Sequence, residues 1–91
     1  MKLTKDNHKW KNYQTNDFII CYRYKNSISG NNDENKQELI YLITWSADVT
    51  IKDKTETINA PAEINIPANT YHKIKALTDI SFILKFPKKE A

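Results

Sequence analysis

Residues 62–74 of this 91-residue chain read Ala62-Glu63-Ile64-Asn65-Ile66-Pro67-Ala68-Asn69-Thr70-Tyr71-His72-Lys73-Ile74. Apolar and polar residues alternate before the proline and again from His72 onward, which is the pattern of two β-strands. Pro67 and Asn69 are turn-forming residues, so we expect residues 67–70 to join the two strands. The turn then fixes the direction in which the His72 side chain points.

Short runs of β-branched and aromatic residues lie on both sides of this stretch and predict further strands. Together with the two strands above, the predicted strands are residues 17–25, 38–44, 47–52, 56–59, 63–66, 72–77 and 80–86. The polar segment 26–36 contains the only glycine, Gly30, and is predicted to be a loop that borders a functional site. About seven short strands without a convincing helix predict an all-β sandwich or barrel.

The chain is long enough for one domain and too short for two. Residues 1–16 are polar except for Trp10 and Tyr13, and they are predicted to form an N-terminal arm or edge segment. A short helix, a loop and an edge strand all fit that segment. The barrel is predicted to span residues 17–87, and the charged tail 88–91 is predicted to be frayed.

The composition argues against several classes of function. The net charge is only +3, the lysines are dispersed, and Arg23 is the only arginine, so the charge is interpreted as a solvated surface and nucleic acid is a disfavoured partner. The single cysteine, Cys21, lies in an apolar run, which predicts a buried, unreactive thiol. No apolar segment has the length of a signal peptide or a membrane span, so we expect a cytoplasmic protein without a membrane partner.

The turn before His72 resembles the second motif of the cupins, a family of small double-sheet jelly-roll barrels. That motif contains Pro-x-Gly-x-x-His, and Pro67, Asn69 and His72 stand at its three fixed positions. Asparagine is, after glycine, the residue that best tolerates the left-handed backbone of such a turn. Pro61 stands where the motif opens with Gly, and Ala76 where it ends with Asn. The resemblance covers residues 17–86 and implies a cupin-type jelly-roll barrel with little or no helix.

The first cupin motif is degenerate in this chain. Residues 38–45 resemble its Glu-to-Gly half, with Glu38 at the glutamate and Trp45 at the glycine, while the two motif histidines fall on Asn32 and Glu34. A tryptophan does not take a positive φ cheaply. We therefore expect either a turn rebuilt around Ser46 or a Trp45 side chain that packs over the barrel mouth, in the core or at an interface.

In metal-binding cupins these motifs hold one divalent metal through three histidines and a glutamate. The resemblance therefore implies a ligand-binding site made of His72, Glu38, Glu34 and Asn32. The candidate metal ligands are His72, Glu38 and Glu34, and the candidate metals are Fe, Mn, Ni and Zn. Two other interpretations stay open, a metal-free pocket in which His72 and Glu38 bind a small polar ligand, and an interior pair that only stabilises the scaffold. His72 and Glu38 are also the candidate catalytic acid–base pair.

Strand parity predicts the surroundings of this pair. If His72 and Glu38 point inward, alternate residues of their strands follow them, and the others face outward. The outward residues of the strand 38–44 are apolar and predict a homodimer, namely Leu39, Tyr41 and Ile43. The second histidine, His8, lies in a polar segment and is predicted to be a solvated surface residue.

Three classes of function remain. The degenerate first motif favours a small cupin that binds a small molecule in its barrel, with a reduced or absent metal site. The retained His72 and Glu38 favour a small cupin metalloenzyme of the oxygenase or isomerase type. The mild basic charge and the apolar outer face favour a protein-interaction or nucleic-acid-associated β-domain.

Overall fold

A computed structural model describes residues 1–7 and 9–87 of the chain. The described residues form ten strands and no helix: β1 (Lys2–Asp6), β2 (Trp10–Gln14), β3 (Ile19–Arg23), β4 (Ile28–Asn32), β5 (Glu38–Thr44), β6 (Ser46–Ile51), β7 (Lys54–Asn59), β8 (Ala62–Ile66), β9 (His72–Ala76) and β10 (Ile80–Lys85). All seven predicted strands are present, with ends that agree within two residues. No helix long and apolar enough to cross a membrane occurs in the described part of the chain.

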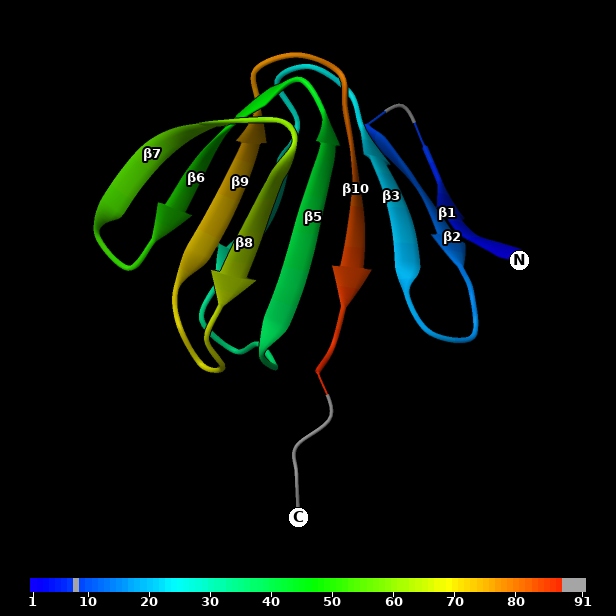
Figure 1. The fold of residues 1–91 in the computed structure, drawn as a ribbon, viewed down its shortest axis with the longest axis horizontal. Coiled ribbons are helices and arrows are strands. Elements are labelled where there is room, and N and C mark those ends of the chain that lie inside the picture. Colours follow the sequence, from blue (N-terminus) through cyan, green and yellow to red (C-terminus); the bar gives the residue numbers. More distant parts are fainter. Residues whose placement is uncertain (8, 88–91) are drawn as a thin grey trace.

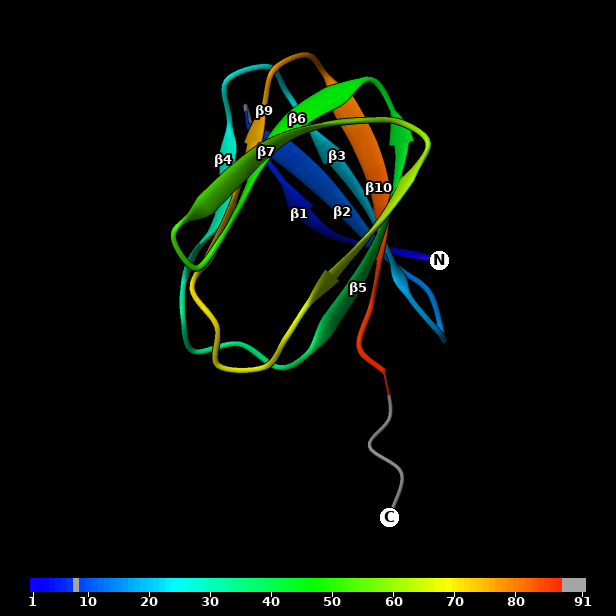
Figure 2. The ribbon, with the colours of Figure 1, turned by 60° about the vertical axis from the view of Figure 1, so that its left-hand side comes forward.

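The strands form two antiparallel sheets (Figures 1 and 2). One sheet has six strands in the order β1-β2-β3-β10-β5-β8, and the other has four in the order β4-β9-β6-β7. Strands far apart in the sequence are therefore neighbours, because β3 pairs with β10 and β4 pairs with β9. The core between the sheets takes apolar side chains from both, including Ile40, Leu42, Val49, Ile74 and Phe82. The prediction of an all-β, double-sheet barrel without a helix is confirmed.

The inward faces of β5 and β9 follow the predicted parity. His72, Ile74 and Ala76 are buried, and Lys75 between them is exposed. On the outer face of β5, Ile43 is 48% exposed, and Leu39 and Tyr41 are half-buried. The homodimer stays a prediction, and the molar mass from light scattering will test it.

The segment predicted to be a loop contains β4, so that prediction is wrong for residues 28–32. Gly30 has a φ of 80° and Asn31 a φ of 58°. These left-handed residues produce an irregularity in the pairing of β4 with β9, between Gly30 and Asn32. Turn-type residues therefore lie inside a strand here, because the bulge uses the same backbone conformation as a turn.

Two of the alternatives predicted for Trp45, a turn rebuilt around Ser46 and packing in the core, are wrong. Trp45 takes a φ of 63° in the one-residue connection between β5 and β6, so the turn is not rebuilt around Ser46. Its side chain is 68% exposed and therefore does not pack in the core. The Ala60 amide donates a hydrogen bond to the Trp45 carbonyl at 2.8 Å, and this bond from a residue outside the turn stabilises the turn. Long-range pairing outweighs the local cost of about 1–2 kcal/mol for a left-handed residue. An interface role for the indole stays a prediction.

Two other local predictions can be compared with the structure. Asn69 has a φ of 52°, as expected for the residue that replaces the motif glycine. Residues 1–16 contain β1 and β2, which form the edge of the six-stranded sheet, so the edge strand is the alternative that the fold adopts. His8 and residues 88–91 lie outside the described residues.

Candidate functional site

The two sheets meet at His72 and Glu38. His72 begins β9 and Glu38 begins β5, and these strands start at the same end of the barrel (Figure 1). The distance from His72 Nε2 to Glu38 Oε2 is 3.1 Å, and the side chains are only 5% and 14% exposed. The fold thus brings together, inside the 5 Å or so that a direct or water-bridged contact allows, two residues 34 positions apart in the sequence.

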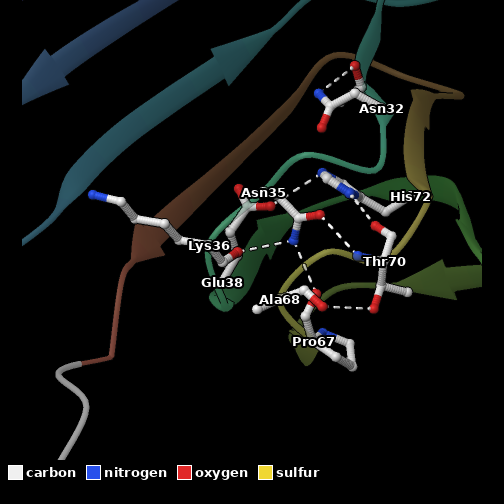
Figure 3. A network of polar contacts seen from close by, with 9 residues as sticks. Asn32, Asn35, Lys36, Glu38, Pro67, Ala68, Thr70 and His72 are labelled. Atoms are coloured by element: carbon white, nitrogen blue, oxygen red, sulfur yellow. Dashed lines mark hydrogen bonds and ion pairs between the residues drawn. The ribbon is translucent and has the colours of Figure 1, made fainter.

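The turn before His72 fixes the orientation of the imidazole. His72 Nδ1 lies 3.1 Å from the Thr70 carbonyl oxygen. A carbonyl only accepts, so Nδ1 carries the proton and Nε2 of the neutral ring presents a lone pair. Thr70 is itself held by Asn35, whose Oδ1 accepts from the Thr70 amide at 3.1 Å and whose Nδ2 donates to the Pro67 carbonyl at 2.9 Å (Figure 3). The connection between β4 and β5 therefore helps to aim the ring.

Gly30 leaves the space that the His72 ring occupies. A Cβ at position 30 would lie 2.8 Å from His72 Cδ2 and 2.9 Å from Nε2. Real Cβ atoms do not approach other atoms this closely, so a side chain here would displace the ring. The only glycine of the chain is thus required twice, for its positive φ and for this close approach.

Glu38 is a largely buried carboxyl group whose oxygen Oε2 has one polar contact, with His72. Burial raises the pKa of Glu38 above its ordinary value of 4.5, and the neighbouring His72 lowers it by a smaller amount. Glu38 Oε2 has no hydrogen-bond partner among the described residues, although it lies 3.1 Å from Nε2. Buried polar oxygens nearly always have a partner. Beside its contact with His72, this oxygen keeps a further lone pair that a ligand can use.

The raised pKa of Glu38 predicts a pH dependence of stability. A carboxyl whose pKa is higher in the folded state favours folding most below its unfolded pKa, and this contribution is lost as the pH rises through the folded pKa. We therefore expect the wild type to lose stability relative to Glu38→Gln as the pH rises from 4.5 toward neutrality. Urea unfolding of both proteins between these limits checks this. A wild-type advantage that grows with pH would show that the attraction to His72 outweighs burial.

The other two predicted ligands lie nearby, but no side-chain hydrogen bond or ion pair joins either of them to His72 or Glu38. Asn32 is opposite His72 in the β4–β9 pairing, and its amide donates to the Gly30 carbonyl at 3.2 Å. Glu34 is exposed at the rim of the cavity and forms no ion pair with a described residue.

The donor atoms do not fit the metal that the resemblance implies. His72 has the tautomer of a metal ligand, and Glu38 could add an oxygen. No group of three His, Cys, Asp or Glu residues within 1–7 and 9–87 is arranged to hold a metal ion. Two ligands fall short of the three or more protein ligands of a typical metal centre. We therefore derive no reaction step through a metal.

A cavity of about 390 Å³ adjoins the His72–Glu38 pair. Its apolar wall includes Ile40, Ile74, Phe82 and Leu84, and its polar lining includes a residue that sequence reasoning missed, Arg23. Arg23 is only 8% exposed and lies two positions after Cys21, on the same face of β3. The alternation of Phe18, Ile20 and Tyr22 with Cys21 and Arg23 was the available signal, since a buried Cys21 implies a buried Arg23.

Cys21 itself is unreactive, as predicted. The side chain is fully buried, and burial raises the pKa of the thiol to about 11. A thiol with this pKa is protonated at neutral pH and is a poor nucleophile.

Comparison with solved structures identifies the fold. The chain resembles an RmlC-like cupin from Shewanella frigidimarina, with a TM-score of 0.80, 13% identity, and coverage of 98% of this chain and 86% of that one. It resembles a cupin superfamily protein from Desulfitobacterium hafniense, with a TM-score of 0.75, 10% identity, and coverage of 93% and 84%. KdgF from Halomonas sp. matches with a TM-score of 0.72 and 12% identity, over 98% and 90% of the two chains.

These likenesses concern the fold and not the chemistry. No protein-family model and no curated protein sequence matches the chain. At 10–13% identity, a shared backbone carries no information about shared ligands. The fold is that of a small cupin domain, and the function has to be argued from the site.

Proposed function

We propose that this chain uses its cupin fold to bind a small molecule in the barrel, at the cavity beside His72 and Glu38. The observation that carries the proposal is the buried pair of Glu38 Oε2 and His72 Nε2, which lie 3.1 Å apart and have no other polar contact among the described residues. Two buried polar atoms beside a cavity that has both an apolar wall and several polar groups are typical of a ligand-binding site. A ligand group that can both donate and accept, such as a hydroxyl, would satisfy both atoms.

The same pair supports acid–base catalysis as a second candidate. The raised pKa of Glu38 allows this carboxyl group to hold or release a proton closer to neutral pH than an ordinary glutamate does. Simple binding remains the first proposal, because no complete metal-ligand set occurs among the described residues, and the Ser29 hydroxyl in the lining contacts Arg23 and no general base.

Binding can be tested through the His72 ring, because the chain has only two histidines. A panel of small alcohols, amides and carboxylic acids is titrated against the protein while the ring signals are followed by NMR. We expect some compounds to shift the His72 signals and to raise the melting temperature. At a hundred times its Kd, a ligand stabilises the folded state by about 2.7 kcal/mol.

Two variants separate a specific site from a general surface effect. Glu38→Gln is expected to weaken binding by about tenfold, since a hydrogen bond to a charged group contributes about 1.5–3 kcal/mol. Glu56→Gln, at an exposed carboxylate on β7 that does not line this cavity, is the matched control and is expected to leave affinity unchanged. If no compound in the panel moves the His72 signals, the proposal is wrong.

Elemental analysis of the purified protein addresses the metal alternative. Stoichiometric Fe, Mn, Ni or Zn that disappears in His72→Ala would contradict metal-free binding and support the metalloenzyme.

Association with nucleic acid is checked by a binding assay across salt concentrations, because such binding is strongest at low salt. No affinity at low salt would remove that alternative.

A further inference from the structure

Arg23 is a buried cation in the wall of the cavity. It ends β3, and its side chain is 8% exposed and lines the same cavity as His72 and Glu38. The proposed function uses the polar pair but gives no role to this arginine. A guanidinium withdrawn from water is costly unless an opposite charge accompanies it.

The partners of Arg23 are all neutral. Nε donates to Ser29 Oγ at 2.8 Å, and Nη1 donates to Asn12 Oδ1 at 2.6 Å and to the Tyr22 carbonyl at 2.9 Å. No described carboxylate lies within ion-pair distance of the guanidinium. These contacts hold the group in place and leave its positive charge uncompensated.

Two aromatic rings lie against the guanidinium. Arg23 Cζ lies 5.3 Å from the centre of the Trp10 ring and 5.3 Å from the centre of the Phe82 ring. Both distances are in the range of cation–π contact. The rings and the neutral acceptors together keep the fork in one orientation, so little entropy is lost when an anion binds to it.

The oxygen acceptors around the guanidinium engage only two of its nitrogens. Nε and Nη1 donate to them, no acceptor oxygen among the described residues binds Nη2, and the Cys21 thiol, a weak acceptor, also contacts the group. Burial lowers the pKa of Arg23 from its ordinary value, as expected for a cation without a counter-charge, but an arginine stays protonated at neutral pH. The cavity therefore contains a fixed positive charge with free donors.

We propose that Arg23 is the anion-recognising residue of this cavity and that the ligand is a small monocarboxylic acid. This inference rests on the proposed function, because it names the ligand class of the same site. The carboxylate binds the free donors of Arg23, and the apolar body packs against the wall formed by Ile40, Ile74 and Leu84. A hydroxyl or carbonyl group of the ligand reaches the His72–Glu38 pair.

The charges of the cavity favour a monocarboxylate over a phosphate. Arg23 supplies the one buried positive charge, and Glu38 in the same lining repels further negative charge when it is ionised. The other two charged residues of the lining, Lys36 and Glu34, are exposed and of opposite sign, so they add no net charge. A phosphate ester carries more than one negative charge near neutral pH. The cavity volume of about 390 Å³ also suits a ligand of a few carbon atoms rather than a sugar nucleotide.

The test uses the wild-type protein, because Arg23 is the only arginine and its side-chain NMR signals are unambiguous. Butyrate, 2-hydroxybutyrate, hexanoate and benzoate are titrated, with the corresponding amides and inorganic phosphate as comparison probes. We expect at least one carboxylate to shift the Arg23 and His72 signals together, and its amide to bind at least tenfold more weakly.

Two variants complete the test. Arg23→Lys keeps the positive charge and removes the planar guanidinium with its several N–H donors. We expect this variant to bind carboxylates at least tenfold more weakly and amides about as well as the wild type does. Lys75→Met, which removes an exposed charge on β9, is the control and should bind as the wild type does. The unfolding curve of Arg23→Lys shows whether the variant is folded. If it is not, the NMR titration of the wild-type protein still tests the inference.

The possible results separate this inference from the proposed function. Amides or alcohols that shift the His72 signals while no carboxylate moves those of Arg23 would overturn the inference and leave the proposed function standing. Tighter binding of phosphate than of every carboxylate would overturn the choice of ligand class. If no probe of any class shifts either residue, both proposals are wrong.

Discussion

Replacing Gly30 with alanine is expected to lower the free energy of unfolding by about 2–5 kcal/mol and to displace the His72 imidazole. Alanine is strained at a φ of 80°. Its Cβ would also lie 2.8 Å from Cδ2 of the His72 ring and 3.1 Å from the His72 backbone carbonyl oxygen. Urea unfolding measures the loss of stability, and the NMR signals of the ring report its new position.

A double-mutant cycle separates the two causes. In a His72→Ala background the ring is absent, so Gly30→Ala should cost less: the left-handed strain of about 1–2 kcal/mol and the close contact with the backbone carbonyl of residue 72 remain. An equal cost in both backgrounds would mean that the contact between Gly30 and the ring contributes nothing. Such a result would also weaken the account of how the ring is aimed.

Shortening Phe82 to alanine is expected to cost about 3–5 kcal/mol, which is a large part of the total stability of a domain this small. Phe82 is 3% exposed in the core, contacts the Arg23 guanidinium and lines the cavity. The variant therefore loses apolar burial and one of the two rings that orient the arginine. Chemical denaturation gives the change in stability.

Phe86→Ala is the matched control for this experiment. Phe86 follows β10 and is 48% exposed, so its removal exposes little new surface and should cost much less than that of Phe82. Equal losses for the two variants would show that Phe82 does not anchor the core. If Phe82→Ala folds, its cavity is larger and its affinity for carboxylates should fall, because Arg23 is held less firmly.

Much of the fold could be predicted from local patterns. The alternation of apolar residues located seven strands, and the Pro67–Thr70 turn was correct down to the left-handed Asn69. The failures share one cause. β4 and Trp45 adopt conformations that their own residues disfavour, because pairing with distant strands such as β9 outweighs local preference.

Part of the candidate site could also be predicted from the sequence. The motif resemblance selected His72 and Glu38, and parity gave the correct inward faces of their strands. Asn32 and Glu34 were chosen from the spacing of the first cupin motif, and this spacing does not predict the direction of a side chain that follows a bulge. Arg23 was overlooked because a charged residue at a strand end is usually solvated, and its neutral partners come from three separate segments.

The sequence by itself determined the class of fold, the turn that aims His72 and the burial of Cys21, because these depend on residue periodicity and on backbone preferences of single residues. Only the tertiary structure decided that Gly30 makes room for the His72 ring and that Arg23 shares a cavity with His72 and Glu38. Those facts depend on which strands become neighbours. Strand order arises from packing across the whole barrel, and no local pattern in the chain specifies it.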